Sequence, residues 1–194
     1  SDQRIGYSFI YPGAGYGGSC FPKDVKALTK IATEYGYNAQ LITSVEKVND
    51  AQKLVLAQKI VKRFGEDLTG FTFGIWGLSF KPGTDDMREA PSIYVIKELV
   101  GRGAKIKAYD PKAIDEAKAH YLKGLQNITY VASKYDALND ADALVLLTEW
   151  KEFGSPDFEE MKTKLKSPII FDGRNQYITY DIENIGLEYH RIGK

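Results

Sequence analysis

The single cysteine of the sequence, Cys20, is the residue whose type and position point most directly to chemistry. It comes just before Pro22, a residue suited to the first position of a helix. The dipole and free N–H groups of a helix N-terminus favour a thiolate over a thiol, and Lys23 adds a positive charge nearby. Asp24, one helical turn further on, opposes ionisation of the thiol but could hold or polarise a water. A nucleophile and an inert, buried cysteine both remain open at this position.

Other reactive groupings are less well supported. Neither His120 nor His190 is placed near Cys20 by the sequence, so a Cys–His pair of the protease type is not indicated. Two histidines and one cysteine without metal-ligand spacing argue against a metal site. Asp85 and Asp86 resemble a metal-binding pair, but turn chemistry beside a helix N-terminus explains them better.

A glycine-rich loop precedes the cysteine. Residues 13–18 match the G-x-G-x-x-G pattern of dinucleotide-binding loops. That fingerprint needs a strand before it, a helix after it and an acid closing a second strand about 20 residues later. Here two helical stretches follow, and Glu34 lies inside the first. A flexible linker is an alternative, but we favour a loop whose bare backbone lets N–H groups approach a bound anion or sugar.

Composition excludes several classes of protein. The chain has 194 residues with 26 basic and 26 acidic side chains, and this zero net charge argues against a generic nucleic-acid binder. An apolar fraction of 43% with 12% aromatics suffices for a folded core. No apolar run approaches the ~18 residues of a membrane span, and residues 1–6 lack the features of a signal peptide. One cysteine cannot form an internal disulfide, which fits a reducing compartment, so a cytoplasmic location is expected.

Helical periodicity dominates the first third of the chain. Apolar residues recur at spacings of three and four between residues 25 and 35, which predicts a helix from Pro22 to Gly36. Asn38 is a candidate N-cap for a second helix that ends near Phe64. That helix would have some 25 residues and a length of about 37 Å. Such a length suits a spine that joins two domains or two subunits.

The remainder alternates strands with helices, which indicates a parallel α/β sheet with right-handed crossovers. Helices are expected to open at Pro91 and at Pro111, the latter running to about His120. The expected strands are 71–76, 105–109, 128–131, 141–147, 168–171 and, at the edge, 187–191.

Ligands of such sheets bind beyond the carboxyl ends of the strands. The loops to watch are therefore those at residues 78–89, 110–111, 148–150 and 172–175. These loops carry Lys81, Arg88, Asp110, Glu149 and Arg174, so polar side chains gather at the expected edge.

Three segments in matching order resemble the nucleotide-sugar 6-dehydrogenase family, the UDP-glucose/GDP-mannose dehydrogenases. They are residues 13–24 (GAGYGGSCFPKD), residues 77–92 (GLSFKPGTDDMREAPS) and residues 171–175 (FDGRN). The first two are long and specific, and the resemblance covers nearly the whole chain. It implies the catalytic-cysteine loop and central helical segment with a long dimerisation helix over residues 1–66. A Rossmann-like, parallel-sheet UDP-sugar-binding domain is implied over residues 67–194.

The resemblance also implies an activity: NAD-dependent, two-step oxidation of a nucleotide sugar, with UDP-glucose oxidised to UDP-glucuronate as the expected reaction. Cys20 matches the family's nucleophile, which attacks the C6 aldehyde. Asp24 matches an aspartate that arranges the hydrolytic water. A thioester lets the second oxidation proceed before hydrolysis, which explains the residue type. The family's NAD-binding domain is expected upstream of this sequence, so the 194-residue chain alone is not expected to turn over.

Binding roles follow from the same resemblance. Arg4 resembles an arginine that reaches into a neighbouring subunit's site, so a homodimer or higher homo-oligomer is expected. Tyr7, Phe9 and Tyr11 also alternate as an edge strand would, and Lys81 could be an ordinary solvated charge. Cofactor contacts are implied for Cys20, Lys23 and Arg88, and no metal is expected. Substrate contacts are implied for Arg4, Phe9, Tyr11, Pro12, Gly13, Ala14, Gly15, Tyr16, Gly17, Phe80, Lys81 and Arg174.

Two alternatives stay open. One is a dehydrogenase of another nucleotide sugar, such as UDP-N-acetylmannosamine or GDP-mannose. The other is a catalytically dead nucleotide-binding or dimerisation module.

Overall fold

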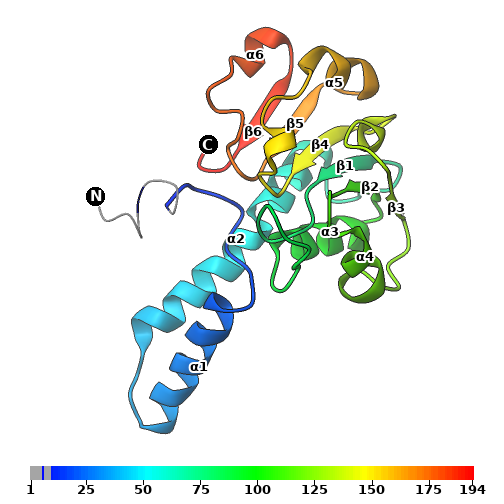
Figure 1. Cartoon of the computed structure of the whole chain (residues 1–194). Coiled ribbons are helices and arrows are strands. Elements are labelled where there is room, and N and C mark those ends of the chain that lie inside the picture. The colour runs from blue at the N-terminus through cyan, green and yellow to red at the C-terminus, as the bar shows by residue number, and fades with distance from the viewer. Residues whose placement is uncertain (1–5, 7–9) are drawn as a thin grey trace.

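The computed structural model describes residue 6 and residues 10–194, so the predictions for Arg4, Tyr7 and Phe9 lie outside the described residues. A helical hairpin of α1 (Phe21–Glu34) and α2 (Gln40–Phe64) projects from an α/β body (Figure 1). None of the helices in this described part of the chain is long and apolar enough to cross a membrane.

The long helix α2 has 25 residues, as predicted, and joins the hairpin to the body. Its N-cap is Ala39, so the prediction of Asn38 as the cap is wrong; the backbone turns into the helix one residue later. Along the second half of α2, Leu56 and Ile60 are fully buried in the core that covers one face of the sheet. The first half instead leaves apolar side chains such as Leu41 exposed.

Six parallel strands form one sheet in the order β3-β2-β1-β4-β5-β6. The chain therefore reverses direction across the sheet between β1 and β4. The predicted α/β class with a parallel sheet is confirmed, and all six predicted strands are present, including the edge strand. Their bounds are β1 (Thr72–Trp76), β2 (Lys105–Tyr109), β3 (Ile128–Tyr130), β4 (Ala143–Leu146), β5 (Ile169–Asp172) and β6 (Glu188–Arg191).

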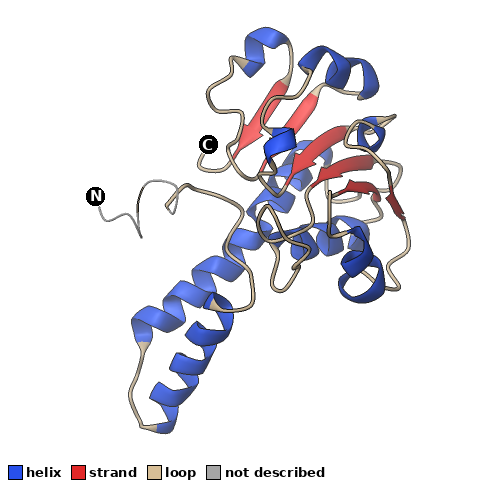
Figure 2. Ribbon diagram, viewed as in Figure 1, coloured by secondary structure: helices blue, strands red, loops and turns tan. Residues whose placement is uncertain are grey.

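Helices cover both faces of the sheet (Figure 2). Side chains of a strand alternate between the two faces, and here apolar side chains lie on both of them and are buried under helices. Phe73 and Ile75 of β1 pack with α2 and with α3 (Pro91–Gly101). Trp76 points to the other face, where its ring stacks on Phe153 at 5.0 Å. That second face is covered by η4 (Asp136–Leu138), η5 (Lys151–Phe153), α5 (Phe158–Lys164) and α6 (Ile182–Ile185).

Local turns account for the helices that the sequence placed wrongly or not at all. The helix predicted from Pro111 begins only at α4 (Ile114–Glu116) and continues as the π-helical turn η3 (Ala117–Tyr121). The delay arises because Asp110 Oδ1 accepts the N–H groups of Lys112 and Ala113, both at 2.9 Å, and so closes a turn there. Helix α5 is capped by Asp157, which accepts two N–H groups of its first turn. That cap was a usable sequence signal.

Candidate functional site

A pocket of about 930 Å³ lies where the glycine-rich loop meets the carboxyl edge of the sheet. The loop forms one wall, the first half of α2 a second, and residues after β1, β4 and β5 a third. This is the sheet edge that the sequence analysis selected. Of the predicted substrate residues, the pocket is lined by Tyr11, Pro12, Gly13, Gly15, Tyr16, Gly17, Phe80 and Arg174; its other lining residues are Phe21, Leu41, Ser44, Val45, Val48, Asn49, Gln52 and Glu149.

Two amide side chains of α2 hold the loop. Asn49 accepts the N–H of Tyr16 at 2.8 Å and donates to the carbonyl of the same residue at 3.2 Å. Gln52 donates to the carbonyl of Gly13 at 2.7 Å. Neither residue was predicted to be a site residue from the sequence. Their signal was a polar pair at a spacing of three on a helix whose neighbouring turns are apolar.

The glycines of the loop are required by close packing. A Cβ on Gly17 would collide with the carbonyl oxygen of Glu89. Gly18 has a φ of +96°, a conformation that favours glycine, and a Cβ there would lie 2.8 Å from the ring of Phe80. Its N–H donates to the carbonyl of Arg88 at 2.7 Å. The loop is therefore packed against the segment after β1, and two helices follow it as predicted.

Cys20 occupies the N-cap position of α1, directly before the pocket residue Phe21. Its side chain is exposed, so the alternative of a buried cysteine is wrong. The sulfur lies 3.5 Å from the hydroxyl of Ser19. Asp24 begins the next turn, with its N–H bonded to the Cys20 carbonyl at 2.9 Å, and its exposed carboxylate pairs with Lys23 at 3.3 Å.

Arg88 lies on the cysteine side of the loop. Its guanidinium makes two hydrogen bonds to Asp86, at 3.0 and 2.8 Å, and these raise the pKa of Arg88. Asp86 also belongs to the turn in which Thr84 Oγ1 accepts its N–H, which agrees with the turn interpretation of the acidic pair. Across residue 6 and residues 10–194, no cluster of three metal-ligating side chains is found.

Two of the predicted substrate residues in the described part of the chain lie apart from the pocket lining. The Lys81 ammonium sits 5.2 Å over the ring of Phe80, at an exposed position on the same loop. Ala14 is fully buried, and its methyl group lies beneath the glycine loop next to Gly173. Ala14 therefore packs the loop onto the sheet edge, which places its side chain away from any ligand in the pocket.

An ion pair closes the sheet side of the pocket. Arg174 Nη2 donates to Glu149 Oε1 at 2.7 Å, and Nε lies 2.6 Å from Oε2. The turn that presents Arg174 is fixed by Asp172, whose Oδ1 accepts the Arg174 N–H at 2.9 Å. Asp172 is fully buried, and this burial raises the pKa of its carboxyl group.

A second buried carboxylate joins the loops at the carboxyl edge of the sheet by hydrogen bonds. Asp110, which follows β2, accepts the N–H groups of Leu78 and Ser79 at 2.7 and 3.2 Å. It also accepts the indole N–H of Trp150 at 3.1 Å. Asp110 thus joins the loops after β1, β2 and β4, and so fixes the positions of Phe80 and Glu149 relative to each other.

Comparison with known proteins identifies the family of the chain. Residues 74–179 match the UDP-binding domain of the UDP-glucose/GDP-mannose dehydrogenase family, and residues 1–51 match the central domain of that family. The chain belongs to the UDP-glucose/GDP-mannose dehydrogenase family. The pocket draws on both of these matched segments, since Tyr11 to Asn49 lie in the first and Phe80, Glu149 and Arg174 in the second.

Members of this family resemble the chain along its whole length. The UDP-glucose 6-dehydrogenase of Pseudomonas aeruginosa is 44% identical over 196 residues, which cover 100% of this chain and 43% of that protein. The UDP-glucose 6-dehydrogenase YwqF of Bacillus subtilis is 42% identical, with 100% of this chain and 43% of the relative covered. The structure of a UDP-glucose dehydrogenase from Pyrobaculum islandicum superposes with a TM-score of 0.81 at 30% identity, covering 97% and 40% of the two chains. The chain thus spans less than half the length of these relatives.

Proposed function

We propose that this chain supplies the catalytic cysteine and the UDP-binding site of an NAD-dependent UDP-glucose 6-dehydrogenase. The observation that carries the proposal is the pocket in which the glycine-rich loop faces the Glu149–Arg174 pair at the carboxyl edge of a parallel sheet, with Cys20 directly before the pocket residue Phe21. Parallel sheets bind their ligands at this edge. The UDP-glucose 6-dehydrogenases among the relatives favour UDP-glucose as the substrate.

In this proposal the pocket binds the nucleotide sugar. Arg174 provides the positive charge for a phosphate group, and a guanidinium suits that role because it can donate two parallel hydrogen bonds. The loop backbone around Gly13 and Gly15 approaches the ligand closely, as a chain without side chains can. Lys81 and Phe80 contribute from the loop after β1. Arg4 and Phe9 stay predicted substrate contacts.

Cys20 then acts as the nucleophile. Its sulfur adds to the C6 aldehyde made by the first oxidation and forms a C–S bond, and the aldehyde oxygen takes up a proton to give a thiohemiacetal. Loss of a hydride and a proton from that adduct gives a thioester, and one water hydrolyses the thioester to the carboxylate and returns the thiol. Asp24, one turn along α1 with an exposed carboxylate, holds that water. The exposed sulfur is consistent with attack on a ligand in the neighbouring pocket.

NAD supplies the hydride acceptor for both oxidations, with two molecules consumed for each uronate formed. Near the cysteine, Lys23 and Arg88 are exposed cations that suit an anionic cofactor. Each pairs with a neighbouring carboxylate, and surface pairs of this kind exchange at little cost. These two residues are therefore proposed to contact the NAD diphosphate from the cysteine side.

The helical hairpin is proposed to join two copies of the chain into a homodimer or a higher homo-oligomer. Its apolar side chains are exposed to an extent that is unusual for a folded protein, with Tyr35 86% and Leu28 51% exposed. An exposed apolar surface of this kind marks an interaction site. The hairpin projects away from the sheet and leaves this surface accessible (Figure 1).

Titration calorimetry with UDP and GDP tests the substrate class on the 194-residue chain. UDP should bind more tightly than GDP, and the chain alone should reduce no NAD when given UDP-glucose. A preference for GDP would favour a GDP-sugar dehydrogenase, and binding of neither nucleotide would overturn the proposal. Production of NADH by this chain alone would contradict the expected division of labour with a separate cofactor domain.

A further inference from the structure

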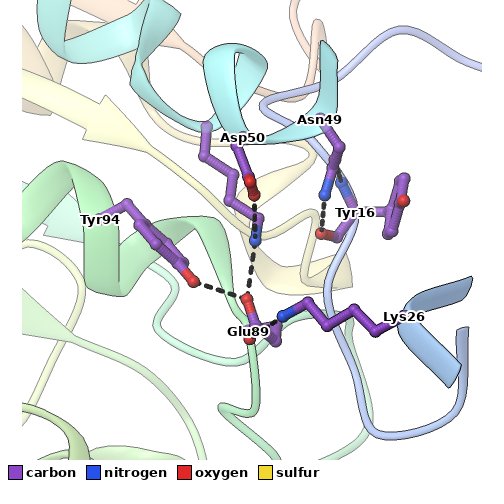
Figure 3. A network of polar contacts seen from close by, with 7 residues as sticks. Tyr16, Lys26, Asn49, Asp50, Glu89 and Tyr94 are labelled. Atoms are coloured by element: carbon purple, nitrogen blue, oxygen red, sulfur yellow. Dashed lines mark hydrogen bonds and ion pairs between the residues drawn. The ribbon is translucent and has the colours of Figure 1, made fainter. Parts of the chain in front are cut away.

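An almost fully buried lysine links the helical hairpin to the sheet domain. Lys53 of α2 is only 1% exposed, and its ammonium lies 2.8 Å from Glu89 Oε2 and 4.3 Å over the ring of Tyr94. Tyr94 donates its hydroxyl proton to the same Glu89 oxygen at 2.5 Å. Figure 3 shows Tyr94 and Lys26 reaching the carboxylate from opposite sides. A buried charge requires such partners, because it has lost its water.

The same carboxylate binds the helix that carries the cysteine. Lys26 of α1 donates to Glu89 Oε1 at 3.0 Å, and Lys26 follows Cys20 by six residues on that helix. Glu89 therefore bonds to side chains of α1, α2 and α3 at once. Hydrogen bonds from Lys53 and then Tyr94, with a smaller one from Lys26, lower the pKa of Glu89 to about 2. The carboxylate is thus ionised throughout the neutral range.

The backbone at Glu89 supports the cysteine loop. Glu89 has a φ of +53°, a conformation that is uncommon for a residue other than glycine. In this conformation the Arg88 carbonyl accepts the N–H of Gly18, and the Glu89 carbonyl lies directly beneath Gly17. A sparsely populated backbone conformation persists where the surroundings fix it, and here the three donors to the side chain do so.

We propose that Glu89 is a positioning residue, whose three-way clamp with Lys53, Lys26 and Tyr94 sets the Cys20 loop against the UDP-binding domain. Glu89 does not line the pocket, so it acts on the loop and not on the ligand. This inference rests on the proposed function only in taking Cys20 as the reacting residue. The holding of the loop itself is a property of the chain that can be measured without any turnover.

Hydrogen–deuterium exchange on the 194-residue chain tests the clamp. Glu89→Gln keeps the shape of the side chain and removes its charge, so exchange in peptides covering residues 16–20 should accelerate by about tenfold. Peptides from β1 and β4 should accelerate much less, and only as far as the global stability of the chain falls. The matched control is Glu98→Gln, which weakens the pair with Arg102 at the C-terminal end of α3 and should leave residues 16–20 unchanged. Lys26→Met, at an exposed position, serves as a second variant that should shift the same peptides in the same direction.

Kinetics of the NAD-dependent enzyme that contains this chain separate positioning from stability. Glu89→Gln should lower kcat while the KM for the UDP-sugar and the affinity for UDP stay near wild type, since the pocket lining is intact. Uniformly faster exchange across the whole chain, or unchanged exchange at residues 16–20, would overturn the clamp. If Cys20 does not react with substrate, the kinetic comparison no longer reports on the position of the reacting residue. The exchange experiment still decides whether Glu89 holds the loop.

Discussion

Arg174 and Glu149 form a two-point ion pair on the sheet side of the pocket, with nitrogen–oxygen distances of 2.7 and 2.6 Å. The pair brings together the loops after β4 and β5, two neighbouring strands. A Cβ on Gly13 would lie 3.0 Å from Arg174 Nη1, so the guanidinium also packs directly against the glycine-rich loop. The Arg174 guanidinium that is proposed to bind the substrate is therefore held in place. An anionic ligand must compete with the Glu149 carboxylate for it.

Arg174→Met should weaken UDP binding to the 194-residue chain by roughly 10–100-fold, the range expected for losing a hydrogen bond to a charged group. Calorimetry with UDP provides the measurement. Arg102→Met is the matched control, because Arg102 is also ion-paired, with Glu66 and Glu98, but lies outside this pocket. Equal losses in the two variants would show that the effect is one of stability and not of binding.

Glu149→Gln should act in the opposite direction and tighten UDP binding at low ionic strength. The substitution removes the negative charge that competes with the ligand while the amide oxygen can still accept a hydrogen bond from Arg174. The gain should shrink as salt is added, because salt screens the competing charge. A weaker affinity at low salt would mean that Glu149 orients Arg174 more than it competes for it.

The sheet and its functional edge were predictable from the sequence for a physical reason. A strand that is buried on both faces appears in the sequence as a continuous apolar run. The end of that run marks the carboxyl end of the strand, and ligands of such sheets bind beyond it. The loops that hold Phe80, Glu149 and Arg174 could thus be predicted from the sequence alone. Lys53 and Glu89 were not singled out, because a lysine on a long helix and a glutamate in a polar loop normally lie in solvent. The one available signal was the position of Lys53, three residues before Leu56 on the face that becomes buried.

Cys20→Ser should abolish uronate production by the NAD-dependent enzyme while the affinity for UDP changes little. A serine cannot form the thioester, and Cys20 is not among the residues that line the pocket. Product analysis and UDP titration of the same variant give the two readouts. Unchanged uronate production would refute the cysteine mechanism, and a parallel loss of UDP binding would indicate a disturbed loop.

Charged substitutions on the apolar side of α1 should separate the proposed dimer. Leu28 and Ile31 are 51% and 50% exposed and lie outside the pocket lining. The double variant Leu28→Glu/Ile31→Glu should be monomeric by light scattering at concentrations where the wild type is a dimer, because burying two carboxylates in an interface is costly. Thr33→Glu, at an exposed position on the opposite side of the same helix, is the control and should stay dimeric. A monomeric wild type would contradict the proposed assembly.

The Glu89 clamp should make the stability of the chain fall in acid. The pKa of Glu89 is lowered from 4.5 to about 2 in the folded chain, first by the hydrogen bond from Lys53. A carboxylate whose pKa is depressed by folding stabilises the fold fully above its unfolded value and loses this contribution as the pH falls through the folded value.

The groups that face Glu89 are Lys53, Lys26 and Tyr94, with Asp50 3.6 Å from the Lys53 ammonium. Because these other groups are common to the wild type and Glu89→Gln, the difference in stability between the two proteins reports the Glu89 carboxylate. Urea unfolding at several pH values should show the wild type more stable than Glu89→Gln near pH 7, and the difference should shrink between pH 4.5 and pH 2. A difference that stays constant down to pH 2 would show that the variant acts through packing and not through the carboxylate charge.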